Sequence, residues 1–395
     1  MPRVRIALCI ALLGALMLVS TAHAAVYFRD VPGGLDQTVA GEHFVVHFGA
    51  DVSASQAQRG LGDLEHAYAT FVGLGFPSPL PDADGLIDVY VFDTGAGEGG
   101  TTRPDTTDPQ TGAWISIGPA SVADYLVYFH EVFHVFQFTL DNLARSPLAE
   151  ATATWGAQQM FVPPPNSARE GPNLNASLDC DLPAPCGELK YERWPFYEYL
   201  SERFGPGVIR ELFEADRALG TNAPLGAVLD ATLSAHGSDA SDAYLGFVRA
   251  YLTGDFTREN LRGAPARSQF VVTTGRRSGP VAVPPVTADH LGATYLLFAP
   301  PESERGCRAA KLTVRVGLPD GVPTQPVLAK GSAKAVALPI TGNVATTTIP
   351  WKTCATPSAV LARMALPNGS TTVDAASFTV TASLKVPPKR KRRHH

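Results

Sequence analysis

Hydrophobic and polar positions alternate in the first part of the chain in the manner of β-strands. Residues 42–48 (EHFVVHF) and 85–93 (GLIDVYVFD) show this two-residue period, and 112–118 (GAWISIG) is a third short strand, expected to be an edge strand that lines a cleft. The preceding residues 95–112 are rich in Gly, Thr, Pro and Asp and are expected to form a loop. Residues 54–75 instead repeat apolar positions at helical spacing and end in glycine. Residues 25–120 are therefore expected to form the N-terminal α/β part of a domain.

From residue 121 the apolar spacing becomes helical, so 121–262 is expected to be a helical part of the same domain. The segments with this spacing are 121–140, 146–161, 193–205, 207–219 and 241–252. Ser121 and Asp124 fit a capping box, which predicts a first helix beginning at Val122. Ser146 followed by Pro147 predicts the start of a second helix, because proline is favoured at the first helical position.

The C-terminal third carries several short strand patterns separated by proline and glycine. Residues 263–284 are rich in both and are expected to be a linker, and 285–386 are expected to form an all-β sandwich. The basic tail, 387–395, is expected to be disordered, with weak contact to an anionic surface as its alternative role. The fold class predicted for the whole chain is α+β.

The first 24 residues have the pattern of a secretory signal peptide. Arg3 and Arg5 precede an apolar run, and Ala22 and Ala24 give the small residues of a cleavage site. The run is shorter than the roughly 20 residues that cross a bilayer, and no later segment is long enough. We therefore expect a secreted protein with no transmembrane segment after removal of the signal.

Cysteine usage agrees with export. Removal of the signal takes away Cys9 and leaves four cysteines, an even number in an oxidising compartment. Cys180 and Cys186 bracket a short loop, and Cys307 and Cys354 both lie in the C-terminal third. Two local disulfides with these pairings are predicted, because neither spacing fits a structural zinc pattern.

Composition excludes some classes of protein. The chain has 395 residues, 45% hydrophobic and 17% charged, which is typical of a globular protein and not of a disordered one. A formal net charge of −5 argues against nucleic acid as the partner. The chain is expected to be a monomer.

Two histidines and a glutamate interrupt the apolar run YFHEVFHVFQF. Burying such groups costs free energy unless each has a partner. His130 and His134 are four residues apart, so they project from one face of the predicted helix, and Glu131 is one step round. This H-E-x-x-H arrangement binds zinc through the two imidazoles and uses the glutamate as general base.

A catalytic zinc site needs a third protein ligand. Glu150 is the strongest candidate, because it lies in the second turn of the next predicted helix among small alanines; its alternative role is an exposed glutamate that favours the helix dipole. His236 is a weaker candidate on a loop, and His43 and His47 are expected to be strand residues. The metzincin extension is absent, since Gln137 and Leu140 occupy its glycine and histidine positions.

The motif HEVFHVFQ, the later ExxAxW (Glu150, Ala153, Trp155) and the stretch from Tyr191 to Gly205 resemble a group of secreted bacterial metalloproteases of the gluzincin type. The resemblance covers roughly residues 40–255. It implies a zinc ion held by His130, His134 and Glu150, with Glu131 as catalytic base and a metallopeptidase-like catalytic domain. The chain departs from the group at Ala151, where glycine is usual, and at Pro147, where tryptophan is frequent.

Such a peptidase also needs a donor for the oxyanion that forms during the reaction. Tyr191 matches the Y-x-x-x-x-F stretch of the group and is the first choice, with Tyr197 and Tyr199 as alternatives that could equally be core aromatics. Gln137 and Asp141 lie on the ligand face and could orient the ligands. The expected function is a secreted zinc metallopeptidase that acts on a protein or peptide; the alternatives are a zinc hydrolase acting on a non-peptide amide and a non-catalytic exported binding protein with a structural metal.

Overall fold

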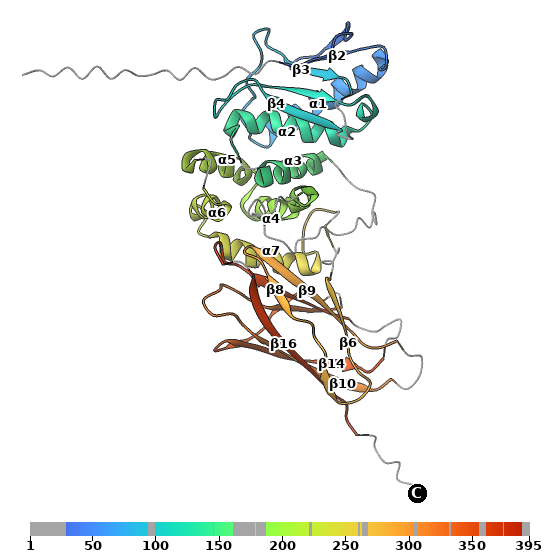
Figure 1. Cartoon of the computed structure of the whole chain (residues 1–395), viewed down its shortest axis with the longest axis vertical. Helices are drawn as coiled ribbons and strands as arrows, with labels where there is room; N and C mark the ends of the chain where they lie inside the picture. The colour runs from blue at the N-terminus through green and yellow to red at the C-terminus, as the bar shows by residue number, and fades with distance from the viewer. Residues whose placement is uncertain are drawn as a thin grey trace, which may run out of the picture.

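The computed structural model of the chain describes residues 29–93, 99–144, 146–160, 178, 187–220, 223–259, 261–262, 268–302, 307–331, 333–354, 361–373 and 375–388. The expected signal peptide, Cys180, Cys186 and the end of the basic tail lie outside these ranges. Within them the chain is a mixed α/β structure with seven α-helices. Figure 1 shows a sheet at one end, layers of helices in the middle and a β-rich part at the other end.

The N-terminal sheet has five strands. In spatial order they are β1 (Gln37–Ala40), β2 (Phe44–Phe48), β3 (Ile87–Val91), β5 (Ala113–Ile117) and β4 (Gly100–Pro104). β2, β3 and β5 are parallel, and β1 and β4 are antiparallel strands at the two edges. The alternation read from the sequence holds, because Phe44, Val46 and Phe48 share the buried face with Ile87 and Val89.

The edge of this sheet differs from the sequence prediction. We expected the strand of residues 112–118 to be an edge strand lining the cleft, but β5 lies between β3 and β4. The edge strand is β4, which comes from a segment that reads as a loop. Its sequence, GTTRP, is polar and has no hydrophobic period, so backbone pairing with β5 defines it.

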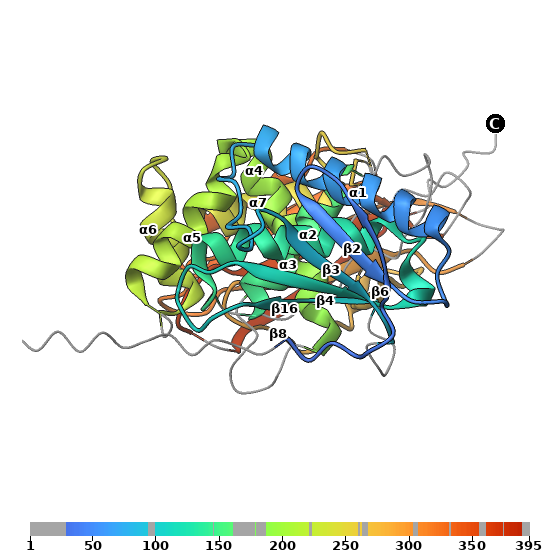
Figure 2. The ribbon, with the colours of Figure 1, turned by 90° about the horizontal axis from the view of Figure 1, so that it is seen from above.

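Two helices cover the buried face of the sheet, as Figure 2 shows from above. The first, α1 (Ala54–Gly73), begins with a complete capping box between Ser53 and Gln56. It packs against β1 and β2, and the second, α2 (Tyr125–Asp141), packs against β5 and β4. Phe71 of α1 contacts the rings of Phe129 and Phe133 of α2. The helix with the metal-binding pattern is therefore held between the sheet and the remaining helices.

The predicted start of α2 is wrong by three residues. Residues Pro119–Ser121 form a short 3₁₀ turn, and the helix begins at Tyr125 rather than Val122. Asp124 is its N-cap, with the carboxylate accepting a hydrogen bond from the Leu126 N–H at 3.0 Å. Aspartate caps a helix as well as serine does, so Asp124, expected inside the helix as the partner of Ser121 in a capping box, serves as the N-cap instead.

The remaining helices stack below α2 in Figure 1. They are α3 (Ser146–Met160), the 3₁₀ segment η2 (Gly187–Arg193), α4 (Trp194–Phe204), α5 (Gly207–Leu219), α6 (Leu225–Ser234) and α7 (Ala240–Thr253). α6 has no counterpart among the predicted helices. α3 contacts α2 on one side, and η2 and α4 on the other. None of the helices in the described ranges is long and apolar enough to cross a membrane.

The C-terminal part contains two packed sheets. The first has the order β12 (Val336–Ala337), β11 (Val327–Lys330), β15 (Ala362–Asn368), β9 (Gly292–Ala299) and β6 (Phe270–Thr273). The second has the order β13 (Ile340–Thr341), β14 (Val344–Lys352), β10 (Ala309–Gly317), β16 (Ala376–Lys385) and β7 (Gly279–Val281), and β8 (Val286–Ala288) also pairs with β16. The expectation of a β-rich C-terminal part is confirmed. The strands begin earlier than expected, because β6 and β7 come from the segment 263–284 that reads as a linker.

Strand β9 of the first C-terminal sheet is buried on both faces. Leu296 and Phe298 of β9 belong to the core between the two sheets. Ala293 and Tyr295 of the same strand belong to the core of the helical part, where the Tyr295 ring lies 6.1 Å from that of Tyr251 on α7. Alternate side chains of β9 thus belong to two adjacent cores, one between the two C-terminal sheets and one shared with the helices.

One predicted disulfide is present in the described residues. Cys307 bonds to Cys354 with their Cα atoms 5.3 Å apart, linking the approach to β10 with the end of β14. This confirms the pairing expected for the C-terminal third. The pairing expected for Cys180 and Cys186 stays a prediction.

Candidate metal centre

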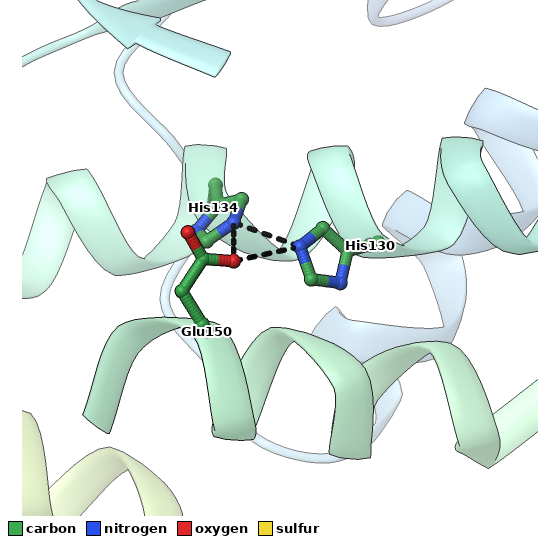
Figure 3. A group of neighbouring side chains, drawn as sticks. All are labelled: His130, His134 and Glu150. Atoms are coloured by element: carbon green, nitrogen blue, oxygen red, sulfur yellow. Dashed lines mark hydrogen bonds and ion pairs between the residues drawn. The ribbon is translucent and has the colours of Figure 1, made fainter. Parts of the chain in front are cut away.

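His130, His134 and Glu150 converge at the interface of α2 and α3 (Figure 3). The Nε2 atoms of the two histidines are 3.1 Å apart, and Glu150 Oε2 lies 3.2 Å from His130 Nε2 and 3.5 Å from His134 Nε2. Among the described residues this is the group of three whose ligand atoms lie within 4.8 Å of one another. The structure therefore brings together the three residues singled out as metal ligands.

The donor set fits a zinc ion. Zinc ligands at 2.0–2.1 Å in a tetrahedron lie about 3.3 Å from one another. The three measured separations of 3.1, 3.2 and 3.5 Å bracket that value. Two imidazoles and one carboxylate also match the donor types of catalytic zinc sites, in which a fourth position is kept for water.

His134 is held on its far side by Gln137. Its Nδ1 atom donates to Gln137 Oε1 at 2.6 Å, and the Gln137 amide in turn donates to the Ala149 carbonyl at 2.8 Å and to Thr152 Oγ1 at 2.9 Å. Proton placement on Nδ1 leaves Nε2 as the lone-pair atom that faces the centre. Gln137 thus contacts His134, and its role in orienting a metal ligand stays a prediction.

Burial and neighbouring charges act in opposite directions on His134. Burial alone would lower its pKa, but the carboxylates of Glu150 and Glu131 raise the pKa above the ordinary value of histidine. A metal ion needs the neutral imidazole, so protons compete with the metal at this position.

Glu150 has different partners for its two oxygens. Oε2 faces the histidines, and Oε1 accepts a hydrogen bond from Lys190 Nζ of η2 at 2.8 Å. Burial alone would raise the pKa of Glu150, but the neighbouring imidazoles of His130 and His134 and the hydrogen bond from Lys190 hold it well below its usual range. The carboxylate is therefore ionised and directed at the histidines, as a metal ligand must be.

Glu131 is almost fully buried, with 5% of its surface exposed, and points toward the edge strand of the N-terminal sheet. Thr102 Oγ1 of β4 donates to Glu131 Oε2 at 2.7 Å and also lies 2.9 Å from the Glu131 carbonyl. β4 comes this close because Gly100 has no side chain: a Cβ there would lie 2.9 Å from Glu131 Cγ. One oxygen of the candidate base is thus fixed by β4.

Tyr191 is the tyrosine that the structure places beside the centre. Its ring lies 5.7 Å from that of His130 and beneath the Lys190 ammonium group, 4.8 Å from Nζ. Tyr197 is buried in the helical core, and Tyr199 Oη accepts a hydrogen bond from Arg203 at 2.9 Å. Tyr197 lies in the helical core and Tyr199 packs against it, so Tyr191 remains the candidate oxyanion donor.

The other candidates have partners elsewhere. His43 pairs with Glu65 at 2.7 Å, His47 with Asp88 at 2.7 Å and His236 with Glu211 at 2.7 Å. Asp141 accepts a hydrogen bond from the Leu143 N–H at the end of α2 and so has a capping role. None of these four residues belongs to the centre.

Sequence reasoning missed Lys190 and Thr102. Lys190 stands next to Tyr191 in the chain, so its position beside the predicted donor was the available signal. No sequence pattern identifies Thr102 as a site residue, because it lies in a polar segment that pairs with β5 only in the folded sheet. Lys190 contacts Glu150 and Thr102 contacts Glu131, each from a different element of the fold.

Comparisons with known proteins add little to this picture. No family model matches the chain, and no curated protein matches it. Among solved structures, the pre-peptidase C-terminal domain of a collagenase from Bacillus anthracis covers 30% of this chain and 99% of its own, at 11% identity and a TM-score of 0.19. A Bacillus thuringiensis Cry1Da tryptic core variant covers 28% of this chain and 20% of its own (11% identity, TM-score 0.16), and the insecticidal delta-endotoxin Cry8Ea1 from the same organism covers 32% and 26% (10% identity, TM-score 0.18). Likenesses this weak carry no argument about function.

Proposed function

We propose that this chain is a zinc-dependent peptidase that hydrolyses peptide bonds with Glu131 as general base. The observation that supports this most directly is the convergence of His130 Nε2, His134 Nε2 and Glu150 Oε2 at tetrahedral spacing. Glu131 follows the first ligand in the chain, as the H-E-x-x-H pattern requires. In the same proposal, the N-terminal sheet and the helices α1 to α7 make up a gluzincin-like catalytic domain.

The residues of the site divide the chemistry among them. His130, His134 and Glu150 would hold the zinc, and bound zinc would polarise the scissile carbonyl and lower the pKa of a water to about 7. Glu131 would take the proton of the attacking water and deliver it to the leaving amine. The Tyr191 hydroxyl would donate to the oxygen that gains negative charge.

The edge strand offers a place for an extended substrate. β4 is the last strand of the sheet on the side of α2, and its Thr102 contacts the base. A peptide that adds to such an edge forms backbone hydrogen bonds independent of its side chains. This favours a peptide over a non-peptide amide as the substrate.

Export of the protein is part of the proposal. The Cys307–Cys354 disulfide is the kind of bond that persists in oxidising compartments, which supports a secreted or cell-envelope location.

The test compares two variants of the purified mature protein. Wild type should contain about one zinc per chain and cleave members of a peptide library. Glu131→Gln should bind zinc like wild type but lose hydrolysis by roughly three orders of magnitude, because the base is gone while shape is kept. Glu150→Gln should weaken zinc binding itself, since a neutral amide is a poor zinc ligand.

Four outcomes would replace the proposal. Wild type without zinc, or His130→Ala with a full complement of zinc, would overturn the metal assignment. Zinc-loaded wild type that cleaves no peptide, with a closed set of four protein ligands, would favour the exported binding protein with a structural metal. Cleavage of small amides alone would favour the amidase.

A further inference from the structure

Lys190 places a positive charge at the metal centre. Its Nζ is 2.8 Å from Glu150 Oε1, on the side of that carboxylate facing away from the histidines. The side chain is held over the Tyr191 ring, 4.8 Å from its centroid, and keeps 25% of its surface exposed. The ammonium group is therefore fixed beside the metal centre, on a side chain that is partly exposed.

Orientation of Glu150 does not by itself call for a charge. Gln137, a neutral amide, orients His134 through a single hydrogen bond of 2.6 Å. A cation beside a metal position repels the metal, and the repulsion is strong at short range in a partly buried site. The charge of Lys190 therefore works against metal binding, and its favourable interaction lies with another group.

The charge balance of the loaded site points to an anion. A zinc ion and Lys190 together carry three positive charges, and the carboxylates of Glu131 and Glu150 carry two negative charges. The loaded site therefore has one positive charge in excess. Glu150 is the carboxylate that contacts Lys190, and the metal would share its charge. An anionic group on the substrate would restore neutrality, and its hydrogen bond to an ammonium group would be strengthened by charge.

We propose that Lys190 determines specificity, so that the site takes peptides with a carboxylate within one residue of the scissile bond. The proposal depends on the proposed function, since the bound ion is part of the charge balance. The Glu150 carboxylate lies between Lys190 Nζ and the point where the three ligand atoms converge. Nζ would therefore lie roughly 5 to 7 Å from a bound zinc ion. One residue spans about 3.5 Å, so a carboxylate one residue from the scissile carbonyl reaches Nζ.

Two sources of that carboxylate are possible: the C-terminus of the peptide and an acidic side chain. The experiment uses three acetylated tripeptides as probes: trialanine with a free C-terminus, trialanine amide, and the amide with aspartate in the last position. Binding to zinc-loaded wild-type protein is measured by calorimetry with ketomethylene analogues of the three peptides, in which –CO–CH2– replaces the amide before the last residue, so that no cleavage intervenes and Glu131 keeps its charge. The free acid should bind at least about tenfold more tightly than the trialanine amide. The aspartate amide reports whether a side chain serves as well.

Substitutions at residue 190 isolate the charge. Lys190→Gln keeps a hydrogen-bond donor for Glu150 but removes the charge, and Lys190→Arg keeps both. We expect Lys190→Gln to retain zinc and to bind the free acid and the amide equally, while Lys190→Arg preserves the preference. Lys311→Gln, at an exposed position on β10, is the matched control and should show the same carboxylate preference as wild type.

The outcomes separate this inference from the proposed function. Wild type without zinc overturns the proposed function and the inference with it. Zinc-loaded protein that shows no difference among the probes, including no measurable binding of any of them, overturns the inference alone. So does a carboxylate preference that survives Lys190→Gln. Loss of zinc from Lys190→Gln but not from Lys190→Arg would show that the cation serves the metal ligand and would also overturn it.

Discussion

A side chain at Gly156 would collide with Phe133. A Cβ built on Gly156 of α3 would lie 2.7 Å from Cδ2 of the Phe133 ring on α2, a separation that real Cβ atoms essentially never show. Phe133 is fully buried and its ring contacts those of Phe71, Phe76 and Trp155, so it has no room to move. The missing side chain sets the distance between the helix that carries the two histidines and the helix that carries Glu150.

Gly156→Ala should therefore loosen both the fold and the metal centre. Alanine in a helix interior gains roughly 0.5–1 kcal/mol over glycine, but overpacking of a core costs about 1–3 kcal/mol. Because Phe133 cannot yield, we expect a net loss of about 1–2 kcal/mol in the free energy of unfolding. Zinc affinity should fall about tenfold or more. Denaturant unfolding and chelator competition measure the two effects.

The control for this substitution is Gly62→Ala. Gly62 lies within α1 and has no heavy atom within 4 Å of the position that a Cβ would take. It should gain stability from the helix propensity of alanine and leave zinc affinity unchanged. A Gly156→Ala protein as stable as this control would show that the two helices can separate without cost.

Thr102 should act on catalysis without acting on the metal. Thr102→Val keeps the β-branched shape but removes the hydroxyl that donates to Glu131 Oε2. We expect zinc content to be unchanged and hydrolysis to fall about 10- to 100-fold, because the base loses the contact that orients it. Thr102→Ser keeps a hydroxyl and should restore most of the activity. Equal rates for the valine and serine variants would remove Thr102 from the site.

The motif residues could be predicted from the sequence because their geometry is local. Helical spacing puts His130 and His134 on one face whatever the rest of the chain does. Glu150 required only that two consecutive helices pack against each other. Lys190 and the edge strand β4 depend on how distant segments meet, and neither has a periodic pattern of its own. β5 has the apolar pattern of a buried strand, but the sequence does not say that a polar segment pairs outside it.

The same contrast explains the C-terminal part. The strands from residue 285 onward were predicted from their period and turns. Short strands β6 and β7 were assigned to a linker, because proline and glycine dominate their surroundings and each has four residues or fewer. The burial of β9 on both faces also follows from tertiary packing, since alternation predicts two faces but not what covers each one.

The acidic cluster around Arg29 should make stability depend on pH. Arg29 pairs with Asp82 at 2.7 Å, with Asp105 at 2.9 Å and with Asp88. Burial and a hydrogen bond with Asp88 raise the pKa of Asp82 from 3.8 to about 6, against the opposing effect of Arg29. The folded state then binds the proton more tightly than the unfolded state does, so this contribution is fully present below about pH 4 and is lost as the pH rises to about 6.

Asp82→Asn should remove that dependence. Relative to the variant, wild type should lose stability between about pH 4 and about pH 6, as followed by urea midpoints across this range. Asp84→Asn, at an exposed neighbouring position, is the control and should keep the wild-type slope. A wild-type slope in Asp82→Asn would assign the pH dependence to other groups.

The Cys307–Cys354 bond should stabilise the C-terminal sheets without affecting the metal centre. The two cysteines are separated by 47 positions in the chain. A cross-link over a loop of this length typically contributes about 2–4 kcal/mol, so Cys307→Ser with Cys354→Ser should lower the midpoint of thermal unfolding. Zinc affinity of the folded double variant should equal that of wild type. A lowered zinc affinity would mean that strain in these sheets reaches α2 and α3.

The junction between the helices and the C-terminal sheet should make the chain unfold as one unit. Tyr295 of β9 is fully buried in the helical core, and its hydroxyl has no hydrogen-bond partner among the described residues. Tyr295→Phe removes that hydroxyl and keeps the ring, so it should be neutral or slightly stabilising. Tyr295→Ala leaves a cavity beside Tyr251 and should cost about 3–5 kcal/mol in the free energy of unfolding.

If the core is continuous, tryptophan fluorescence and far-ultraviolet circular dichroism should report one coincident unfolding transition in wild type, and the whole transition should shift in Tyr295→Ala. Two separate transitions, only one of which responds to the alanine variant, would show that the sheets and the helices fold independently.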